Sequence, residues 1–294
     1  MKKTKRKIKY SRGLSPAMLL AFIVVLALLA VLAVRFAQRH NTAADEHDGM
    51  VQVYNGERYV WIVPQDGVER NELTKEDFKT DESGAVTYVG SKYKASRGVD
   101  VSSYQGDIDW QQVSDSGVSF AIIRAGGTYY GSGELYEDDN LLKNIDGARA
   151  AGLRVGVYFF SQAIDETEAR REASYVVTLL EGRKLDMPVF FDWERIGNDT
   201  ARTDEVENET LTSCAVAFCE QVEASGYKAG VYVYNDTGYY GYDLARLQNY
   251  MLWGVGIGSY PYFYYAHDVW QYSYSGRVPG INADCDLDML FEEK

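Results

Sequence analysis

The chain has 294 residues, of which 46% are hydrophobic and 25% are charged, with only 5 prolines. This composition excludes a wholly disordered chain and a collagen-like one. The formal net charge is −13, and all 43 acidic residues follow His40, whereas nine of the 30 basic residues precede it. The chain after residue 40 is therefore strongly acidic, and its repulsion from phosphate backbones excludes a nucleic-acid partner.

The N-terminal residues have the pattern of a membrane anchor. Residues 1–13 carry seven basic residues and no acid, which predicts a cytoplasmic tail. Residues 14–34 hold no charge and, at about 1.5 Å per residue, would reach about 30 Å as a helix. They predict a transmembrane helix that keeps the rest of the chain outside the cytoplasm. The alternative is a cleaved signal peptide, whose apolar region is usually about 7–15 residues long and which would yield a secreted protein.

Residues 35–95 predict an extracytoplasmic linker or a small β module. Residues 35–50 are polar and resemble a tether. From residue 51 to residue 93, β-forming runs alternate with turn signals such as Asn55-Gly56, which predicts a few short strands. This segment contains no pattern that suggests chemistry.

From Arg97 onward the pattern alternates between strands and helices. Buried strands are predicted at residues 118–124, 154–160, 189–192 and 229–234, with helices between them. The chain after residue 234 has room only for strands near 251–257, 268–272 and 285–287, joined mostly by loops. We therefore expect an α/β fold over residues 96–294, an irregular TIM-like βα barrel with about five full βα units and helix-poor final strands.

Two acidic residues lie at the end of the strand predicted at residues 189–192. Asp192 and Glu194 are two positions apart, so they point to the same side of the strand, while Trp193 points to the other. In a parallel barrel, the carboxyl ends of the strands line the active site. Two acids in one dry cleft cannot both ionise freely, and glycoside cleavage uses such a pair. The competing interpretation is a solvated strand end.

Two further acids fit the same site. Asp100 ends a short apolar strand, and Asp286 lies in the predicted last strand. The run Asp284-Cys-Asp-Leu-Asp288 could also suggest calcium, but it lacks the glycine and distal glutamate of an EF-hand loop. The three histidines are too scattered for a metal site. We expect neither a metal nor a cofactor.

Several of these segments together resemble the glycoside hydrolase family 25 lysozymes, the Chalaropsis-type muramidases. The resemblance covers about residues 96–292 and is specific as a set. Its segments are Gly98-Val-Asp-Val-Ser-Ser-Tyr-Gln-Gly106, Phe120-Ala-Ile-Ile-Arg124, Ala151-Gly-Leu-Arg-Val-Gly-Val-Tyr158, Asp192-Trp-Glu194, Trp270-Gln-Tyr-Ser273 and Asp286-Leu-Asp288. It implies an irregular βα barrel that hydrolyses the β-1,4 bond between N-acetylmuramic acid and N-acetylglucosamine in peptidoglycan.

The resemblance also implies roles for individual residues. Glu194 corresponds to the general acid, and Asp192 to its partner, which either stabilises the oxocarbenium-like state or orients the substrate acetamido group. Asp100 and Asp286 complete the acidic floor of the cleft. Tyr158, Arg124 and Gln271 are expected to contact the sugar. Two departures are Phe159, where the family often has histidine, and a glycine-rich run at 254–258.

The expected protein is therefore a membrane-tethered, monomeric muramidase whose partner is the peptidoglycan glycan strand. One alternative is a wall-binding module without turnover, which the glycine-rich run suggests. Another is a hydrolase of a different N-acetylated glycan such as chitin, since chitinases share the Asp-x-Glu pair. We expect the three cysteines, Cys214, Cys219 and Cys285, to be free and buried, because three residues cannot form a disulfide framework.

Overall fold

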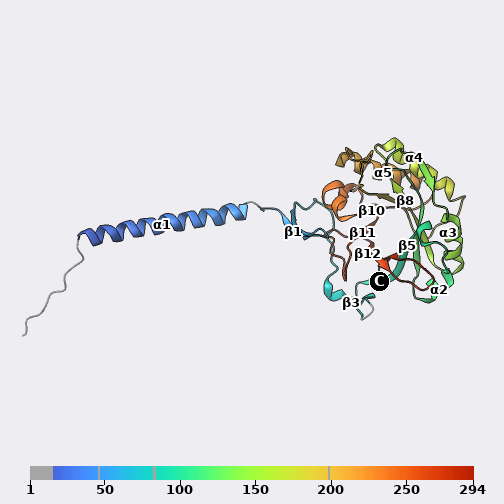
Figure 1. Ribbon diagram of the computed structural model, residues 1–294, viewed down its shortest axis with the longest axis horizontal. Coiled ribbons are helices and arrows are strands. Elements are labelled where there is room, and N and C mark those ends of the chain that lie inside the picture. Colours follow the sequence, from blue (N-terminus) through green and yellow to red (C-terminus); the bar gives the residue numbers. More distant parts are fainter. Residues whose placement is uncertain (1–15, 46, 82–83, 198) are drawn as a thin grey trace, which may run out of the picture. The chain divides into compact units, whose positions relative to one another are not determined.

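The computed structural model describes residues 16–45, 47–81, 84–197 and 199–294 (Figure 1). The chain forms two compact units, Met1–Val51 and Gln52–Lys294. The main element of the first unit is helix α1 (Pro16–Asp45). The predicted cytoplasmic tail at residues 1–13 lies outside the described residues, and the predicted segment boundaries remain predictions.

The expected transmembrane helix at residues 14–34 is wrong. Among the helices of the described residues, none is long and apolar enough to cross a lipid bilayer. Helix α1 does not end with the uncharged run but continues past Val34 through Arg35 and Arg39 to Asp45. Residues 16–34 of the uncharged run are therefore only part of a longer helix.

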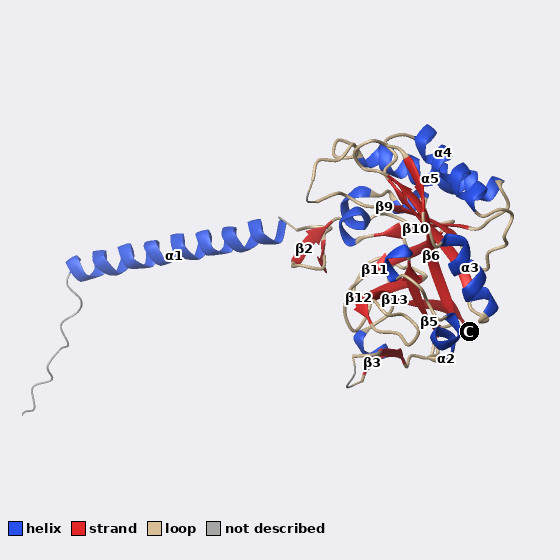
Figure 2. Cartoon of the chain, turned by 45° about the vertical axis from the view of Figure 1, so that its right-hand side comes forward, coloured by secondary structure: helices blue, strands red, loops and turns tan. Residues whose placement is uncertain are grey.

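The second unit is built around a closed barrel of eight strands (Figure 2). In chain order these are β5 (Tyr93–Val101), β6 (Phe120–Thr128), β8 (Arg154–Ser161), β9 (Val189–Trp193), β10 (Ala229–Val233), β11 (Met251–Val255), β12 (Val269–Gly276) and β13 (Cys285–Glu293). The first seven run parallel to their neighbours. The eighth, β13, lies antiparallel between β12 and β5 and closes the barrel. A short strand, β7 (Leu135–Glu137), adds to β6 outside the ring.

The expected fold class, a TIM-like βα barrel with about five full βα units, is therefore wrong. Four connections between barrel strands contain an α-helix in the described part of the chain, and they hold α2 (Trp110–Asp115), α3 (Leu141–Ala150), α4 (Glu166–Leu179) and α5 (Asn208–Ala224). After β10 the connections are short helical turns and loops. Only residues 277–284 separate β12 from β13, and so short a connection cannot return the chain for a parallel strand, which explains the antiparallel closure.

The helices begin and end where local chemistry requires it. Asp165 caps α4 by accepting a hydrogen bond from the Glu168 backbone N–H at 2.9 Å, which satisfies one of the free amides of the first turn. Gly182 follows α4 with a φ of 74°, a left-handed conformation that glycine adopts without strain. Helices α4 and α5 pack side by side on the outside of the barrel (Figure 2).

Large side chains fill the barrel interior. The cluster comprises Phe120, Ile122, Met187, Phe190, Tyr232, Trp253, Val255, Val269 and Leu290, all of them buried. Trp253 lies at its centre, with its ring 5.3 Å from that of Phe190 and 4.8 Å from that of Tyr232. The barrel is thus a packed core, and only its rims are open to substrate. The three cysteines are free and buried, as expected.

The residues before the barrel form two hairpins that pack onto it. The first pairs β1 (Val51–Tyr54) with β2 (Tyr59–Ile62), and the second pairs β3 (Phe78–Thr80) with β4 (Val86–Tyr88). Phe78 of the second hairpin contacts Trp270 at a ring distance of 5.2 Å. Between the hairpins, the Asn71 side chain donates to two backbone carbonyls of the β11–β12 connection. Residues 52–92 are therefore part of the same compact unit as the barrel.

Replacement of Gly126 tests how tightly β6 is packed against β7. A Cβ atom at this position would lie 2.0 Å from the backbone carbonyl oxygen of Tyr136 in β7, which cannot move independently of its strand. We expect Gly126→Ala to lower the free energy of unfolding by about 1–3 kcal/mol. Gly131→Ala is the control, because nothing lies within 4 Å of that Cβ. Equal thermal denaturation midpoints for the two variants would contradict the packing described here.

Candidate active site

The carboxyl end of β9 presents the predicted acid pair. Asp192 is the fourth residue of this strand and only 5% exposed, and Glu194 follows directly after the strand ends. Trp193 lies between them and faces the opposite side, where its indole N–H donates to the Ala163 carbonyl oxygen at 3.3 Å. The alternation of the strand therefore places both carboxyl groups on one side, as the sequence predicts.

The two carboxyl groups of this pair interact directly with each other. Burial raises the pKa of Asp192 well above its ordinary value, and repulsion from Glu194 raises it further. Burial also raises the pKa of Glu194; a hydrogen bond with Asp192 opposes this shift, and the charge of Asp286 adds to it. Asp192 Oδ1 has no donor among the described residues. A single retained proton satisfies both groups, because two adjacent buried carboxylates cannot both be charged.

A second acid cluster forms where the last strand meets the first. Asp286 of β13 and Asp100 of β5 are direct partners in the antiparallel register. Gln271 of β12 bridges them, since its Nε2 donates to Asp100 Oδ2 at 2.7 Å and to Asp286 Oδ2 at 3.2 Å. The Tyr232 hydroxyl donates to Gln271 Oε1 at 2.8 Å, so the amide is held with its NH₂ group toward the acids.

Asp288 belongs to this cluster although the sequence analysis assigned it no role. It is fully buried, and its Oδ1 accepts a hydrogen bond from the Trp253 indole N–H at 2.8 Å. Burial raises its pKa to about 8. Burial also raises the pKa of Asp100 well above normal, and the charges of Asp288 and Asp286 add to that shift. The signal was present in the sequence, because Asp286 and Asp288 are spaced like Asp192 and Glu194.

Arg124 and Tyr158 line the same hollow as Asp100 and Asp286. The Arg124 Nε donates to the buried Asp138 at 2.8 Å, and this ion pair also fixes the neighbouring turn, because Asp138 accepts from the Ser103 backbone N–H. Asp138 was not predicted, and no local pattern indicates it. Burial raises the pKa of the Tyr158 hydroxyl well above normal, so this group stays protonated and can donate to a ligand.

A buried polar network holds the backbone at Glu194. The Gln162 Nε2 donates to the Glu194 carbonyl oxygen at 3.0 Å, and the Thr203 hydroxyl donates to Gln162 Oε1 at 2.8 Å. Behind it, the buried Glu172 accepts from the hydroxyls of Thr128 and Ser161, both at 2.5 Å. These bonds tie helix α4 to the loop that carries Glu194, so the position of its carboxyl group depends on three separate elements.

Two hollows open at this rim of the barrel. One has a volume of about 420 Å³ and is lined by Asp100, Arg124, Tyr158, Tyr274 and Asp286, among others. The second has a volume of about 380 Å³ and is lined by Glu194, Arg195, Tyr234, Asp236, Thr237 and Tyr274. Tyr274 lines both, so the two hollows adjoin each other at this residue, and together they are called the acid groove below. Among the described residues, no set of three or more His, Cys, Asp or Glu side chains is arranged to hold a metal ion.

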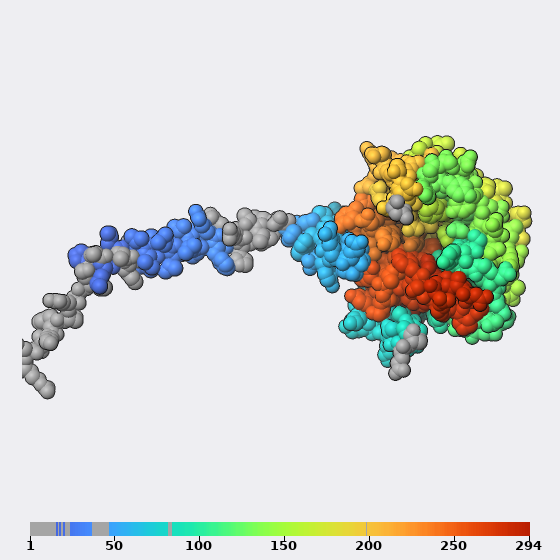
Figure 3. All heavy atoms as spheres, viewed as in Figure 1, coloured from blue at the N-terminus to red at the C-terminus, as the bar shows by residue number. Residues whose placement is uncertain are grey.

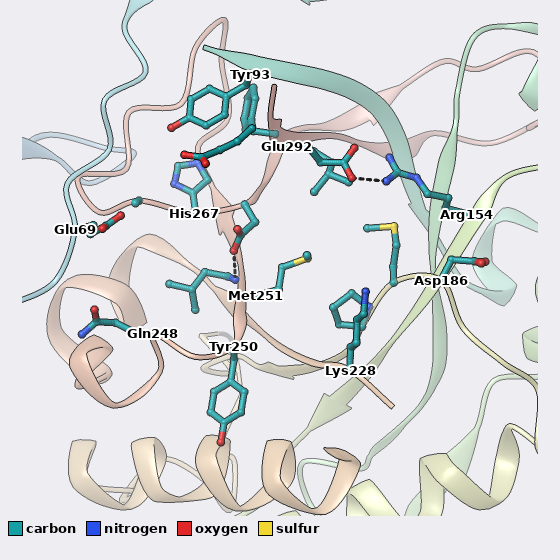
Figure 4. Close-up of a pocket in the computed structure, with 18 of the residues that line it drawn as sticks. Glu69, Tyr93, Arg154, Asp186, Lys228, Gln248, Tyr250, Met251, His267 and Glu292 are labelled. Atoms are coloured by element: carbon teal, nitrogen blue, oxygen red, sulfur yellow. Dashed lines mark hydrogen bonds and ion pairs between the residues drawn. The ribbon is translucent and has the colours of Figure 1, made fainter. Parts of the chain in front are cut away.

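A further hollow of about 610 Å³ lies at the opposite end of the barrel (Figure 4). It is lined by residues where the parallel strands begin, such as Arg154, Met251 and Asp268, and by the end of β13, where Glu292 pairs with Arg154 at 2.9 Å. None of the predicted site residues lines it. Because parallel barrels carry their chemistry at the carboxyl ends of the strands, the acid groove is the candidate active site.

The comparison with protein families agrees with this geometry. The model for "Glycosyl hydrolases family 25" matches residues 99–281, from the end of β5 through β12, and the match includes Asp100, Asp192 and Glu194. The chain belongs to glycosyl hydrolase family 25. Asp286 and Asp288 lie just beyond the matched residues.

Individual relatives support the same assignment. The chain is 30% identical over 199 residues to the autolytic lysozyme of Clostridium acetobutylicum, covering 67% of this chain and 56% of that protein. It is 27% identical over 209 residues to lysozyme M1 of Streptomyces globisporus, covering 65% of this chain and 66% of that protein. The matched part thus spans between about half and two thirds of these relatives.

A solved structure has a similar fold. The autolysin LytC from Streptococcus pneumoniae, in complex with a synthetic peptidoglycan ligand, superimposes with a TM-score of 0.56 and 20% sequence identity. The match covers 72% of this chain and 56% of LytC. At this level of identity the likeness shows the shared fold.

The two departures from the family 25 pattern have packing explanations. Phe159 is fully buried, and its ring lies 6.3 Å from the Tyr175 ring. The position at which the family often has histidine is therefore part of the packed interior here. In the glycine-rich run, a Cβ at Gly254 would lie 2.9 Å from the His267 ring. The Gly256 carbonyl accepts from the Trp270 indole N–H at 2.7 Å. These glycines make room for large neighbouring side chains, so the glycine-rich run is not evidence for a binding module without turnover.

Asp288 gives a pH-dependent test of the buried cluster. Because burial raises its pKa from 3.8 to about 8, the folded state holds a proton that the unfolded state releases, and the associated stability is lost as pH rises through this window. Asp288→Asn keeps an acceptor for Trp253 but cannot ionise. We expect the variant to gain stability relative to the wild type between about pH 5 and about pH 8, as measured by urea denaturation. A stability difference that is independent of pH would refute the assigned protonation.

Proposed function

We propose that this chain is a Chalaropsis-type lysozyme that hydrolyses the β-1,4 bond between N-acetylmuramic acid and N-acetylglucosamine. The observation that carries the proposal is the interacting Asp192–Glu194 pair at the carboxyl rim of a family 25 barrel, where burial raises the pKa of both groups. The names of the relatives, an autolytic lysozyme and lysozyme M1, support the activity. The peptidoglycan ligand of LytC supports the substrate.

In this proposal Glu194 is the general acid. It lines the groove, whereas Asp192 is 5% exposed, so Glu194 is the member of the pair that can reach the glycosidic oxygen. While the proton lies on Glu194, Asp192 is a carboxylate and can stabilise positive charge at the anomeric carbon or orient the acetamido group of the sugar. Burial raises the pKa of both groups, which favours retention of a proton by the pair and so supports its use in acid catalysis.

The remaining polar groups of the groove position the glycan. Asp100 and Asp286, held by Gln271, form the acidic floor, and Tyr158 and Arg124 offer hydrogen-bond donors to the sugar. The acids come from β5, β9 and β13 of one chain, so a monomer suffices for activity. Because peptidoglycan lies outside the cytoplasmic membrane, the barrel acts in the extracytoplasmic space.

Replacement of Glu194 tests the activity. Glu194→Gln keeps the shape of the side chain but removes its proton, and we expect kcat to fall by roughly 10²- to 10⁴-fold. The assay is digestion of purified cell wall, with mass analysis of products for reducing-end N-acetylmuramic acid. Glu205→Gln is the matched control, because Glu205 is exposed and lies outside the groove. Wall binding by the wild type without any new reducing ends would indicate a binding module, and cleavage of chitin alone would change the substrate.

The charge of Asp286 tests the electrostatics of the groove. This charge raises the pKa of Glu194, so its removal lowers the pH at which Glu194 loses its proton. We expect Asp286→Asn to shift the alkaline limb of the profile of kcat/KM against pH toward lower pH. Glu205→Gln, on an exposed acid that lines neither hollow of the acid groove, should leave that limb in place. A shift toward higher pH in Asp286→Asn would be incompatible with the assigned roles.

A further inference from the structure

A third hollow adjoins the acid groove. This hollow has a volume of about 630 Å³ and shares Tyr234 with the hollow of Glu194, and Tyr274 with both hollows that contain the acids. Its other walls include Asn235, Ile257 and Tyr262. The three hollows therefore adjoin one another around Tyr274, and the proposed general acid lines one of them.

The outer wall of this third hollow comes from a part of the chain that precedes the family 25 match. The turn of the β1–β2 hairpin contributes Asn55, Gly56, Glu57 and Arg58, whereas the match begins at residue 99. In Figure 3 the light-blue hairpin region lies directly against the orange part of the barrel unit. A wall built from this segment is a property of this chain and does not follow from the family assignment.

The hairpin is held in place by specific contacts with the barrel. The Tyr54 ring packs edge-on against Tyr262 at 5.0 Å, and the Tyr239 hydroxyl donates to the Tyr54 carbonyl oxygen at 3.3 Å. At the turn, Gly56 has a φ of 98°, and a Cβ there would lie 3.1 Å from Asn235 Nδ2. This close approach requires glycine, and it brings the turn against the residues that line the hollow.

The chemistry of the third hollow is that of a sugar site. Tyr234 and Tyr274 are 39% and 46% exposed, so their rings are available to stack on the faces of pyranose rings. Asn235 Oδ1 is buried and has no partner among the described residues. Glu57 and Arg58 are exposed and form no ion pair with another described residue, so both can hydrogen-bond hydroxyl and acetamido groups.

We propose that the β1–β2 hairpin completes an outer glycan-binding subsite, which makes the enzyme favour long glycan strands over short ones. The occupant is a sugar unit of the peptidoglycan strand beyond the bond that is cut. The inference rests on the proposed function for its substrate class. Its physical basis is that the hollow lined by Glu194 and the hollow lined by Arg58 adjoin each other at Tyr234.

Binding measurements test the subsite without turnover. Glu194→Gln is the background, and the double variant Glu57→Ala/Arg58→Ala is added to it. The probes are a peptidoglycan tetrasaccharide and long glycan strands, both freed of their peptides by an amidase. We expect the preference for long strands over the tetrasaccharide, expressed as a ratio of Kd values, to fall roughly fivefold in the hairpin variant. Glu76→Ala/Lys79→Ala, which removes the same two charges from exposed positions near the second hairpin, should leave the ratio unchanged.

The outcomes separate this inference from the proposed function. Wall cleavage by the wild type together with an unchanged ratio in the hairpin variant would overturn the subsite and leave the lysozyme assignment intact. A lowered ratio without cleavage by the wild type would support the subsite and overturn the assignment. A hairpin effect that appears only with peptide-bearing wall would mean that the turn recognises the peptide stem, which overturns the sugar subsite. Absence of glycan binding would overturn it as well.

Discussion

The pairing of the last barrel strand with the first is the constraint on which the active site depends. Strand β13 runs antiparallel between β12 and β5, so residues near its beginning arrive at the rim where the parallel strands end. This reversal places Asp286 opposite Asp100 and allows Gln271 to bridge them. A parallel eighth strand would have placed residues from its other end at this rim, and the second acid cluster would not have formed.

The site is a concentration of buried acids, which has a cost in stability. The raised pKa values of Asp100, Asp192 and Asp288 mean that each of these groups would be solvated more favourably in the unfolded chain. The aromatic core around Trp253 compensates, and its indole also donates directly to Asp288. The same burial raises the pKa of Glu194, so the feature that destabilises the fold is the one that the proposed acid role requires.

Local patterns in the sequence predicted more of the site than of the architecture. The Asp-x-Glu spacing placed Asp192 and Glu194 correctly on one face, because strand alternation is a local property. Strand alternation likewise places Asp288 on the same side of β13 as Asp286. The ion pair of Asp138 with Arg124 depends on how a distant loop folds back. The direction of β13 depends on a short connection, and strand periodicity carries no information about direction.

The location of the acids on the first and last barrel strands also affects when the protein can become active. During synthesis, β5 and β9 leave the ribosome well before β13, and domains tend to fold as units. Asp100 has no bridging amide and no opposing carboxyl group until β13 has docked. A partly synthesised or partly unfolded barrel therefore has an incomplete acid site. In the proposed lysozyme, the full set of acids is therefore assembled only after the last strand has docked.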